Sequence, residues 1–332
     1  MRKKILLISF LLSLPFWWGI NTLAKNLEDF LFLQEIANNS KRLTSNINQN
    51  FLQGEKKRLE KERMQIEYLK DLEIEAKSAI SIEIDRNGRE RILFEKNSED
   101  SLPIASLTKL MTALIVFDLN ETSIPQLITI TQEAVSQEGS SKYGDLKIGE
   151  KLSIESLLHI MLIESSNDAA FALSQSIGQE GFVDLMNFYA NDLEMKDTHF
   201  VNPTGLEPEG YQELTNLSTA RDLVKLANFI IINYPQIFEI TDKSSYEVLN
   251  PDGSIHHFIP ENTNELLKES DGWQSRIIGG KTGWSPGAGG CLLLVLEGSK
   301  KDGYFINIIL GSNDRFGEMK KIIEAIEQAQ NF

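Results

Sequence analysis

The sequence predicts an α+β fold in which strands from both ends of the chain form one sheet and helices fill the middle. Segments with the apolar patterning of strands occur near residues 79–95 and again at 291–310. Between them, from about residue 120 to 234, the patterning is mainly helical. Strands that enclose a helical segment require a sheet built from distant parts of the chain.

Composition narrows the class of protein. The 332 residues are 41% hydrophobic and 24% charged, which is ordinary for a globular chain. A net charge of −15 argues against nucleic acid as a partner, because phosphate binding needs basic patches. The single cysteine, Cys291, excludes an intrachain disulfide. It lies in an apolar segment, where we expect a small buried hydrophobe.

The N-terminus has the pattern of a targeting segment. Basic residues at positions 2–4 precede an apolar run at 5–20, and the sequence at 22–24 fits a cleavage site. We therefore expect residues 1–24 to be a signal peptide or an uncleaved signal anchor. The rest of the chain would then be exported, and either secreted or held at the extracytoplasmic face of the membrane by its N-terminus.

Residues 25–78 differ from the remainder of the chain. They contain one glycine and no proline, and their apolar stripe is thin. This pattern predicts a helical stalk or linker. The catalytic domain is expected over residues 79–332.

The strands at the two ends of the chain are each expected to pair as a hairpin. Asn87-Gly88 is a turn signal between the first two strands, and a polar turn separates the last two. The predicted strands and the final helix are residues 79–85, 91–95, 291–296, 304–310 and 318–330.

A possible nucleophile stands at the start of a predicted helix. Ser106 and Lys109 are spaced i, i+3, which places both side chains on one helix face. Apolar residues follow from 110 to 119, so we expect the lysine to be desolvated and its pKa lowered. A neutral amine could take the serine proton and activate a nucleophile. The S-x-x-K spacing alone occurs by chance in many chains.

Two later motifs make this hypothesis specific. Ser165-Ser166-Asn167 lies at a predicted turn between two apolar helices, and Lys281-Thr282-Gly283 follows on a predicted strand. These three elements in this order are typical of serine β-lactamases and penicillin-binding proteins. Of the two amines, we expect Lys109 to be the drier one. Lys281, flanked by glycines, is expected to be open to substrate and charged.

The chain resembles the serine D-alanyl-D-alanine carboxypeptidases, the low-molecular-weight penicillin-binding proteins of peptidase family S11. The resemblance runs from about residue 79 to 323. The stretches that carry it are residues 103–109, 164–170, 202–206, 218–223 and 281–291. It implies a β-lactamase/DD-peptidase-like fold, with a five-stranded antiparallel sheet flanked by helices and an inserted all-helical region.

The resemblance also implies catalytic roles. Ser106 would attack the carbonyl between the two D-alanines of a peptidoglycan stem peptide, and β-lactam antibiotics would acylate the same serine. Lys109 would be the base for this step. Ser165 would pass the proton to the leaving amine, and Asn167 would hold Lys109 and the substrate amide.

The remaining predicted substrate-binding residues surround the third motif. They are Lys281, Thr282, Gly283, Trp284 and Arg315. By resemblance, Lys281 adds positive charge, while Thr282 and Arg315 contact the terminal carboxylate. Gly283 lets substrate lie close to the strand. The backbone N–H of Trp284 would complete an oxyanion hole with that of Ser106.

We expect no cofactor and no metal ion. The four histidines have no H-x-x-x-H spacing. His256 and His257 are adjacent on a predicted strand, so their side chains are expected to face opposite ways.

Three other functions stay open at the level of sequence. A D,D-endopeptidase would use the same residues on peptidoglycan cross-links. A class A β-lactamase needs a glutamate for deacylation, of which Glu213 is a faint indication, and Ser166 replaces the aspartate of S-D-N. A non-enzymatic wall-binding scaffold would have a decayed site, whereas every residue of the motifs is present.

Overall fold

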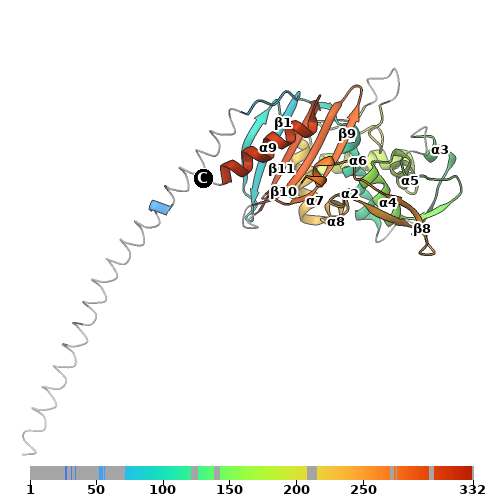
Figure 1. Cartoon of the computed structure of the whole chain (residues 1–332), viewed down its shortest axis with the longest axis horizontal. Coiled ribbons are helices and arrows are strands. Elements are labelled where there is room, and N and C mark those ends of the chain that lie inside the picture. The colour runs from blue at the N-terminus through green and yellow to red at the C-terminus, as the bar shows by residue number, and fades with distance from the viewer. Residues whose placement is uncertain are drawn as a thin grey trace, which may run out of the picture. The chain divides into compact units, whose positions relative to one another are not determined.

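The computed structural model describes residues 72–120, 126–137, 143–207, 215–269, 273, 275–298 and 303–330, and a few helical positions before residue 57 (Figure 1). The chain divides into two compact units, residues 1–63 and 64–332. The predicted signal segment at 1–24 lies outside the described residues, as does most of the predicted stalk. No helix in the described part of the chain is both long and apolar enough to cross a membrane.

One five-stranded antiparallel sheet forms the centre of the second unit (Figure 1). The strand order is β2-β1-β11-β10-β9. The strands are β1 (Ser78–Asp85), β2 (Glu90–Lys96), β9 (Ile277–Ser285), β10 (Gly289–Glu297) and β11 (Gly303–Ser312). The first and last strands lie side by side, with Ile82 opposite Ile306. The predicted α+β fold with a sheet built from both ends of the chain is confirmed.

Both faces of the sheet are covered. In β10 the odd-numbered residues from 291 to 295 lie in one core, and the even-numbered residues from 292 to 296 lie in the other. Burial on both faces explains why this strand is a continuous apolar run. Helix α9 (Arg315–Gln330) covers one face, while α2 (Lys109–Asn120) and α7 (Ala220–Asn233) pack in the core of the other.

The packing of the domain includes residues before the first strand. Ile74 and Ala76 are buried in the same core as α9. The backbone N–H groups of Glu75 and Ala76 both donate to the buried carboxylate of Glu318 in α9. Residues that were expected to belong to the stalk therefore contribute to the core.

A helical region is inserted between β2 and β9, as expected from the resemblance (Figure 1). Its further helices are α3 (Gln132–Val135), α4 (Ile154–His159), η2 (Ile160–Glu164), α5 (Asn167–Gln175), α6 (Gln179–Asp192), α8 (Gln236–Thr241) and η4 (Glu265–Lys268). Three small two-stranded ladders pair β3 (Leu102–Pro103) with β6 (Leu217–Ser218), β4 (Leu127–Thr129) with β5 (Lys151–Ser153), and β7 (Tyr246–Leu249) with β8 (Ile255–Ile259).

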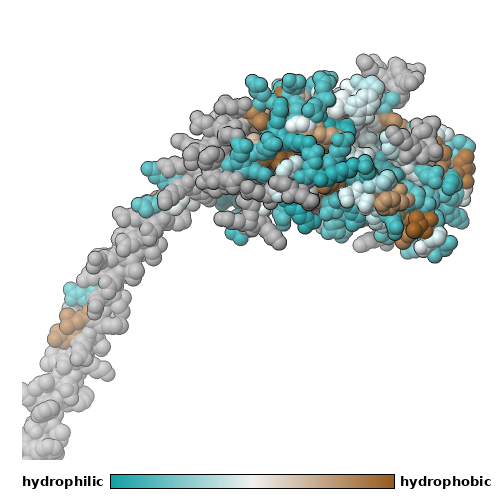
Figure 2. All heavy atoms as spheres, in the orientation of Figure 1, coloured by the Kyte–Doolittle hydropathy of each residue, from teal (hydrophilic) through white to brown (hydrophobic). Residues whose placement is uncertain are grey.

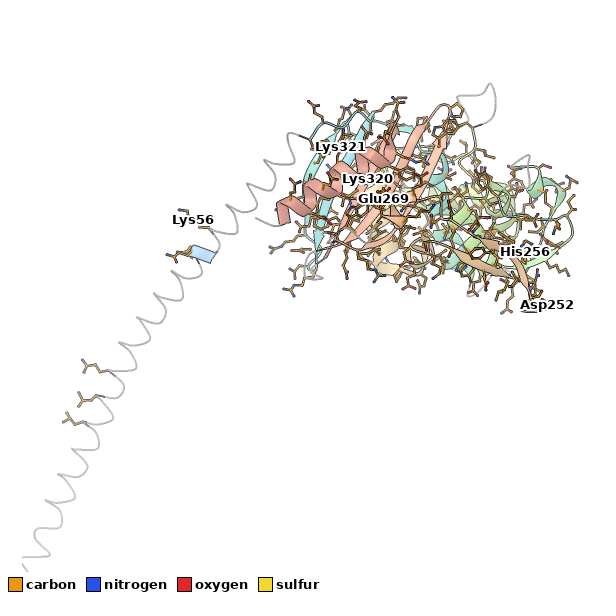
Figure 3. All side chains as sticks on the ribbon, viewed as in Figure 1. Lys56, Asp252, His256, Glu269, Lys320 and Lys321 are labelled. Atoms are coloured by element: carbon orange, nitrogen blue, oxygen red, sulfur yellow. The ribbon has the colours of Figure 1, made fainter. Side chains whose placement is uncertain are left out.

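The β7–β8 hairpin corrects one prediction. The Nδ1 atoms of His256 and His257 lie 2.7 Å apart, so the two rings do not face opposite ways. Val248 pairs with His257 and Leu249 with Ile255, which leaves His256 as an extra residue in β8. Such a β-bulge disrupts the alternation of side chains. Figure 3 shows His256 on this hairpin. In the described part of the chain, no three potential ligand side chains gather as a metal site would require.

The visible surface of this unit is mostly hydrophilic, with small separate apolar patches (Figure 2). Exposed apolar side chains occur on the β7–β8 hairpin, at Leu249, Ile255 and Phe258.

Candidate active site

Ser106 lies in a short 3-10 turn, η1 (Ala105–Thr108), that leads into α2. Side chains at i and i+3 eclipse in a 3-10 turn, which brings Ser106 and Lys109 together. Ala105, just before the nucleophile, has a left-handed φ of 44°, which is rare for a residue with a side chain. Strained backbone of this kind clusters at functional sites.

The Lys109 amine is fully buried and has three oxygen partners. It is 2.8 Å from Ser106 Oγ, 2.6 Å from Asn167 Oδ1 and 2.7 Å from the Thr204 carbonyl oxygen. The amide and carbonyl oxygens can only accept hydrogen bonds. A neutral amine would therefore give its two hydrogens to these oxygens and direct its lone pair at the serine hydroxyl. This arrangement fits a general base for Ser106.

The Thr204 carbonyl is a partner that sequence reasoning did not assign. The side chain of Asn202 holds its turn, because Asn202 Oδ1 accepts from the backbone N–H of Thr204 at 3.1 Å and of Gly205 at 2.7 Å. The sequence Asn202-Pro203-Thr204-Gly205 contains the asparagine, proline and glycine that favour such a turn. No local signal predicts its contact with Lys109, which is 95 positions away.

Ser165 and Asn167 lie at the predicted turn between two helices. The π-helix η2 ends at Glu164, and Ser165 follows in the left-handed conformation with a φ of 66°. Ser166 then caps α5 by accepting a hydrogen bond from the backbone N–H of Ala169. Single turns of π-helix occur frequently at functional sites. The turn presents Ser165 on one side and Asn167, the first residue of α5, on the other.

The expectation that Lys281 is open to substrate is wrong. Its side chain is 1% exposed, and its amine donates to Ser165 Oγ at 2.7 Å and to the Thr282 carbonyl at 3.1 Å. Burial, with smaller effects from Lys109 and Arg315, holds its pKa well below the ordinary value. The neighbouring glycines permit close packing: a Cβ at Gly279 would lie 2.7 Å from Phe238 Cβ.

The rest of the third motif lies against the nucleophile. A Cβ at Gly283 would lie 3.1 Å from the backbone nitrogen of Ser106, so glycine permits this close approach. Arg315 Nη1 donates to the Gly283 carbonyl at 2.8 Å, and burial lowers the pKa of this guanidinium. Trp284 is 65% exposed and lines a cavity of about 420 Å³ with Arg315.

The structure joins six of the nine predicted site residues by hydrogen bonds, namely Ser106, Lys109, Ser165, Asn167, Lys281 and Thr282. They form two hydrogen-bonded groups, one centred on the amine of Lys109 and one on that of Lys281. Burial is the main cause of the lowered pKa of Lys281, and a positive charge on Lys109 adds to it. Thr282 is 4% exposed and has a hydroxyl partner, Thr263, that no motif predicted.

Comparison with known proteins identifies related chains. Residues 64–314 match the family described as D-alanyl-D-alanine carboxypeptidase. The chain is 34% identical over 227 residues to D-alanyl-D-alanine carboxypeptidase DacF of Bacillus subtilis, a match that covers 67% of this chain and 54% of that protein. It is 32% identical over 227 residues to a D-alanyl-D-alanine endopeptidase of Pseudomonas aeruginosa, covering 67% of this chain and 68% of that protein.

Solved structures share the fold. Penicillin-binding protein D2 of Listeria monocytogenes, in its ampicillin-bound form, matches with a TM-score of 0.61 and 29% identity, over 77% of this chain and 98% of that one. A mutant of the Streptomyces K15 DD-transpeptidase matches with a TM-score of 0.66 and 25% identity, over 78% of this chain and 99% of that one.

Proposed function

The chain belongs to peptidase family S11, the D-alanyl-D-alanine carboxypeptidases, and we propose that it removes the terminal D-alanine of peptidoglycan stem pentapeptides. The observation that carries the proposal is the contact of 2.8 Å between Ser106 Oγ and the buried amine of Lys109. Asn167 and the Thr204 carbonyl occupy the amine's other hydrogen-bonding positions.

Acylation begins when Lys109 takes the proton of Ser106. Oγ attacks the carbonyl carbon between the two D-alanines, and the backbone N–H groups of Ser106 and Trp284 stabilise the oxyanion. Donors arranged in advance of the reaction contribute on the order of 3 kcal/mol each. The intermediate collapses to an ester on Ser106, and the C–N bond breaks.

The leaving amine needs a proton, and the Lys281 group supplies a path for it. Ser165 Oγ lies 2.7 Å from Lys281 Nζ, so a proton given up by Ser165 is replaced from that amine. The proton that Lys109 took from Ser106 then restores the Lys281 group, which leaves Lys109 neutral again. Water attacks the ester with Lys109 as base, and that proton passes to Ser106 Oγ as the ester bond breaks, which releases the shortened peptide and restores the serine. Thr282 and Arg315 bind the terminal carboxylate during acylation.

β-Lactam antibiotics should acylate the same serine. Support comes from the Listeria relative, which was solved with ampicillin bound. The strained ring opens when Ser106 attacks its carbonyl, and no separate leaving group departs. The acyl-enzyme is then expected to persist.

A D,D-endopeptidase acting on cross-links is the second candidate. The Pseudomonas relative carries that activity in its name, as does an Escherichia coli relative at 31% identity. The hydrogen bonds around Ser106 and Lys109 serve either reaction. A β-lactamase remains a third outcome of the same assay; Glu213, its candidate glutamate, lies outside the described residues.

A single set of assays separates these functions. We expect a stoichiometric label from a fluorescent penicillin, release of free D-alanine from a stem pentapeptide, and loss of both in Ser106→Ala. Cleavage of a cross-linked dimer without release of D-alanine would favour the endopeptidase. Rapid turnover of penicillin would favour the lactamase. A penicilloyl label on the alanine variant would refute the assignment of the nucleophile.

We further propose that the protein is exported and attached to the membrane through its N-terminal segment. The basic residues at 2–4 and the apolar run at 5–20 support this orientation. Fractionation of cells and N-terminal sequencing of the mature protein test it. A protein found in the cytoplasm would refute export, and a soluble form that begins at residue 25 would refute attachment.

A further inference from the structure

Thr263 contacts the predicted carboxylate-binding residue from outside the three motifs. Its hydroxyl lies 2.7 Å from that of Thr282. Thr263 is half-buried between two buried asparagines, Asn262 and Asn264. Its backbone N–H donates at 3.2 Å to the carbonyl of Ile163, two residues before Ser165. Thr263 therefore lies between β9 and the turn that carries Ser165.

Hydrogen bonds to the end of α8 hold Thr263 at this place. Asn262 Nδ2 donates to the carbonyls of Thr241 at 3.0 Å and Lys243 at 2.9 Å. The hydroxyl of Thr241 in turn accepts from the backbone N–H of Gly280 at 3.0 Å. Gly280 is two residues before Thr282 in β9. The same end of α8 thus holds both threonines by hydrogen bonds to neighbouring residues, so their contact is fixed by the surrounding structure.

The chemistry of two hydroxyl groups suggests what this contact does. A hydroxyl has one hydrogen to donate and two lone pairs, whereas a carboxylate can only accept. In the structure, the Thr282 hydroxyl donates to that of Thr263. When a carboxylate binds, the Thr282 hydrogen turns to it, and the Thr282 oxygen can accept from the Thr263 hydroxyl. Chains of hydrogen bonds polarise one another, which strengthens the bond to the carboxylate.

We propose that Thr263 is a positioning residue for recognition of the substrate's terminal carboxylate, acting through the hydroxyl of Thr282. The proposal rests on the proposed function, because Thr282 must contact that carboxylate. The residue need not touch substrate. Serine can replace it, since serine keeps the hydroxyl, but valine and alanine cannot.

The test compares Thr263→Val with Thr263→Ser on two peptides, one ending in free D-Ala-D-Ala and one with its C-terminus amidated. For the free acid, we expect valine to lower kcat/KM about tenfold, mainly by raising KM, because a net hydrogen-bond contribution of this kind corresponds to about that factor. Serine should stay within about threefold of wild type. For the amide, valine should have little effect. Thr263→Ala provides a second variant without a hydroxyl.

A double variant tests whether the effect passes through Thr282. In a Thr282→Val background, the further change at Thr263 should have little effect on kcat/KM, because residues that act as a unit are not additive. Equal losses on acid and amide, or full additivity with Thr282→Val, would overturn the proposal. Wild-type protein that releases no D-alanine and takes no penicillin label would instead refute the proposed function. Thermal unfolding of each variant confirms that it is folded.

Discussion

Gly205→Ala tests how tightly the turn at residues 202–206 is packed against the nucleophile. Gly205 has a φ of +84°, and a Cβ there would lie 2.1 Å from the carbonyl oxygen of Ala105 and 3.0 Å from the backbone nitrogen of Ser106. Real Cβ atoms essentially never approach closer than 3.0 Å, so one of the two segments must move by about 0.9 Å.

The displacement affects two hydrogen-bond partners of Lys109. One segment carries Ser106, and the other carries the Thr204 carbonyl that accepts from Lys109. A misplacement of about 1 Å in an active site can lower the rate about a hundredfold. We therefore expect Gly205→Ala to acylate with a fluorescent penicillin about a hundred times more slowly than wild type.

Gly253 offers a matched control. It has the same φ of +84°, but no atom lies within 4 Å of its Cβ position. Alanine at either glycine pays the left-handed backbone energy of about 1–2 kcal/mol. Only Gly205→Ala also meets a carbonyl oxygen. We expect Gly253→Ala to lower the unfolding temperature slightly and to keep the wild-type rate of acylation. A folded Gly205→Ala protein with the wild-type rate, or equal loss in both variants, would refute this account of the packing.

Three further predictions follow from the burial of charged and apolar groups. Lys109→Arg should lower acylation at least about a hundredfold, since a guanidinium cannot act as a base; a penicillin label at the wild-type rate would contradict this. Lys281→Met should be more stable than wild type at neutral pH, because in wild type the unfolded chain binds the Lys281 proton more tightly than the folded chain does. The difference in stability should shrink as pH rises toward the ordinary lysine pKa of 10.5. Urea unfolding at several pH values measures this difference, and a difference that grows with pH would contradict the prediction. A chain of residues 79–332 should be less stable than one of 72–332 by about 2 kcal/mol or more, because Ile74 is 5% exposed; equal unfolding midpoints would place Ile74 outside the core.

The contact between Ser106 and Lys109 followed from local geometry, whereas the resemblance to a known family predicted that Asn167, Trp284 and Arg315 share the site. The spacing of Ser106 and Lys109 places both side chains together in any helical turn, and Asn167 begins a helix with its own cap. The strands of the sheet also followed from local patterning, because buried strands appear in the sequence as short apolar segments. These features depend on residues close together in the chain, which is why sequence alone predicts them.

Only the tertiary structure decided the environment of each group. Lys281 was expected to be open because of its glycines, whereas Gly279 lets α8 pack closely against β9 and the Lys281 side chain is buried. The contact between His256 and His257 depends on a bulge set by pairing with β7. Thr204 lies 95 residues from its partner Lys109 in the sequence. Thr263 lies 19 residues from its partner Thr282. Burial and hydrogen bonding across such separations arise only in the assembled fold, because the residues that exclude water from a side chain come from distant parts of the sequence.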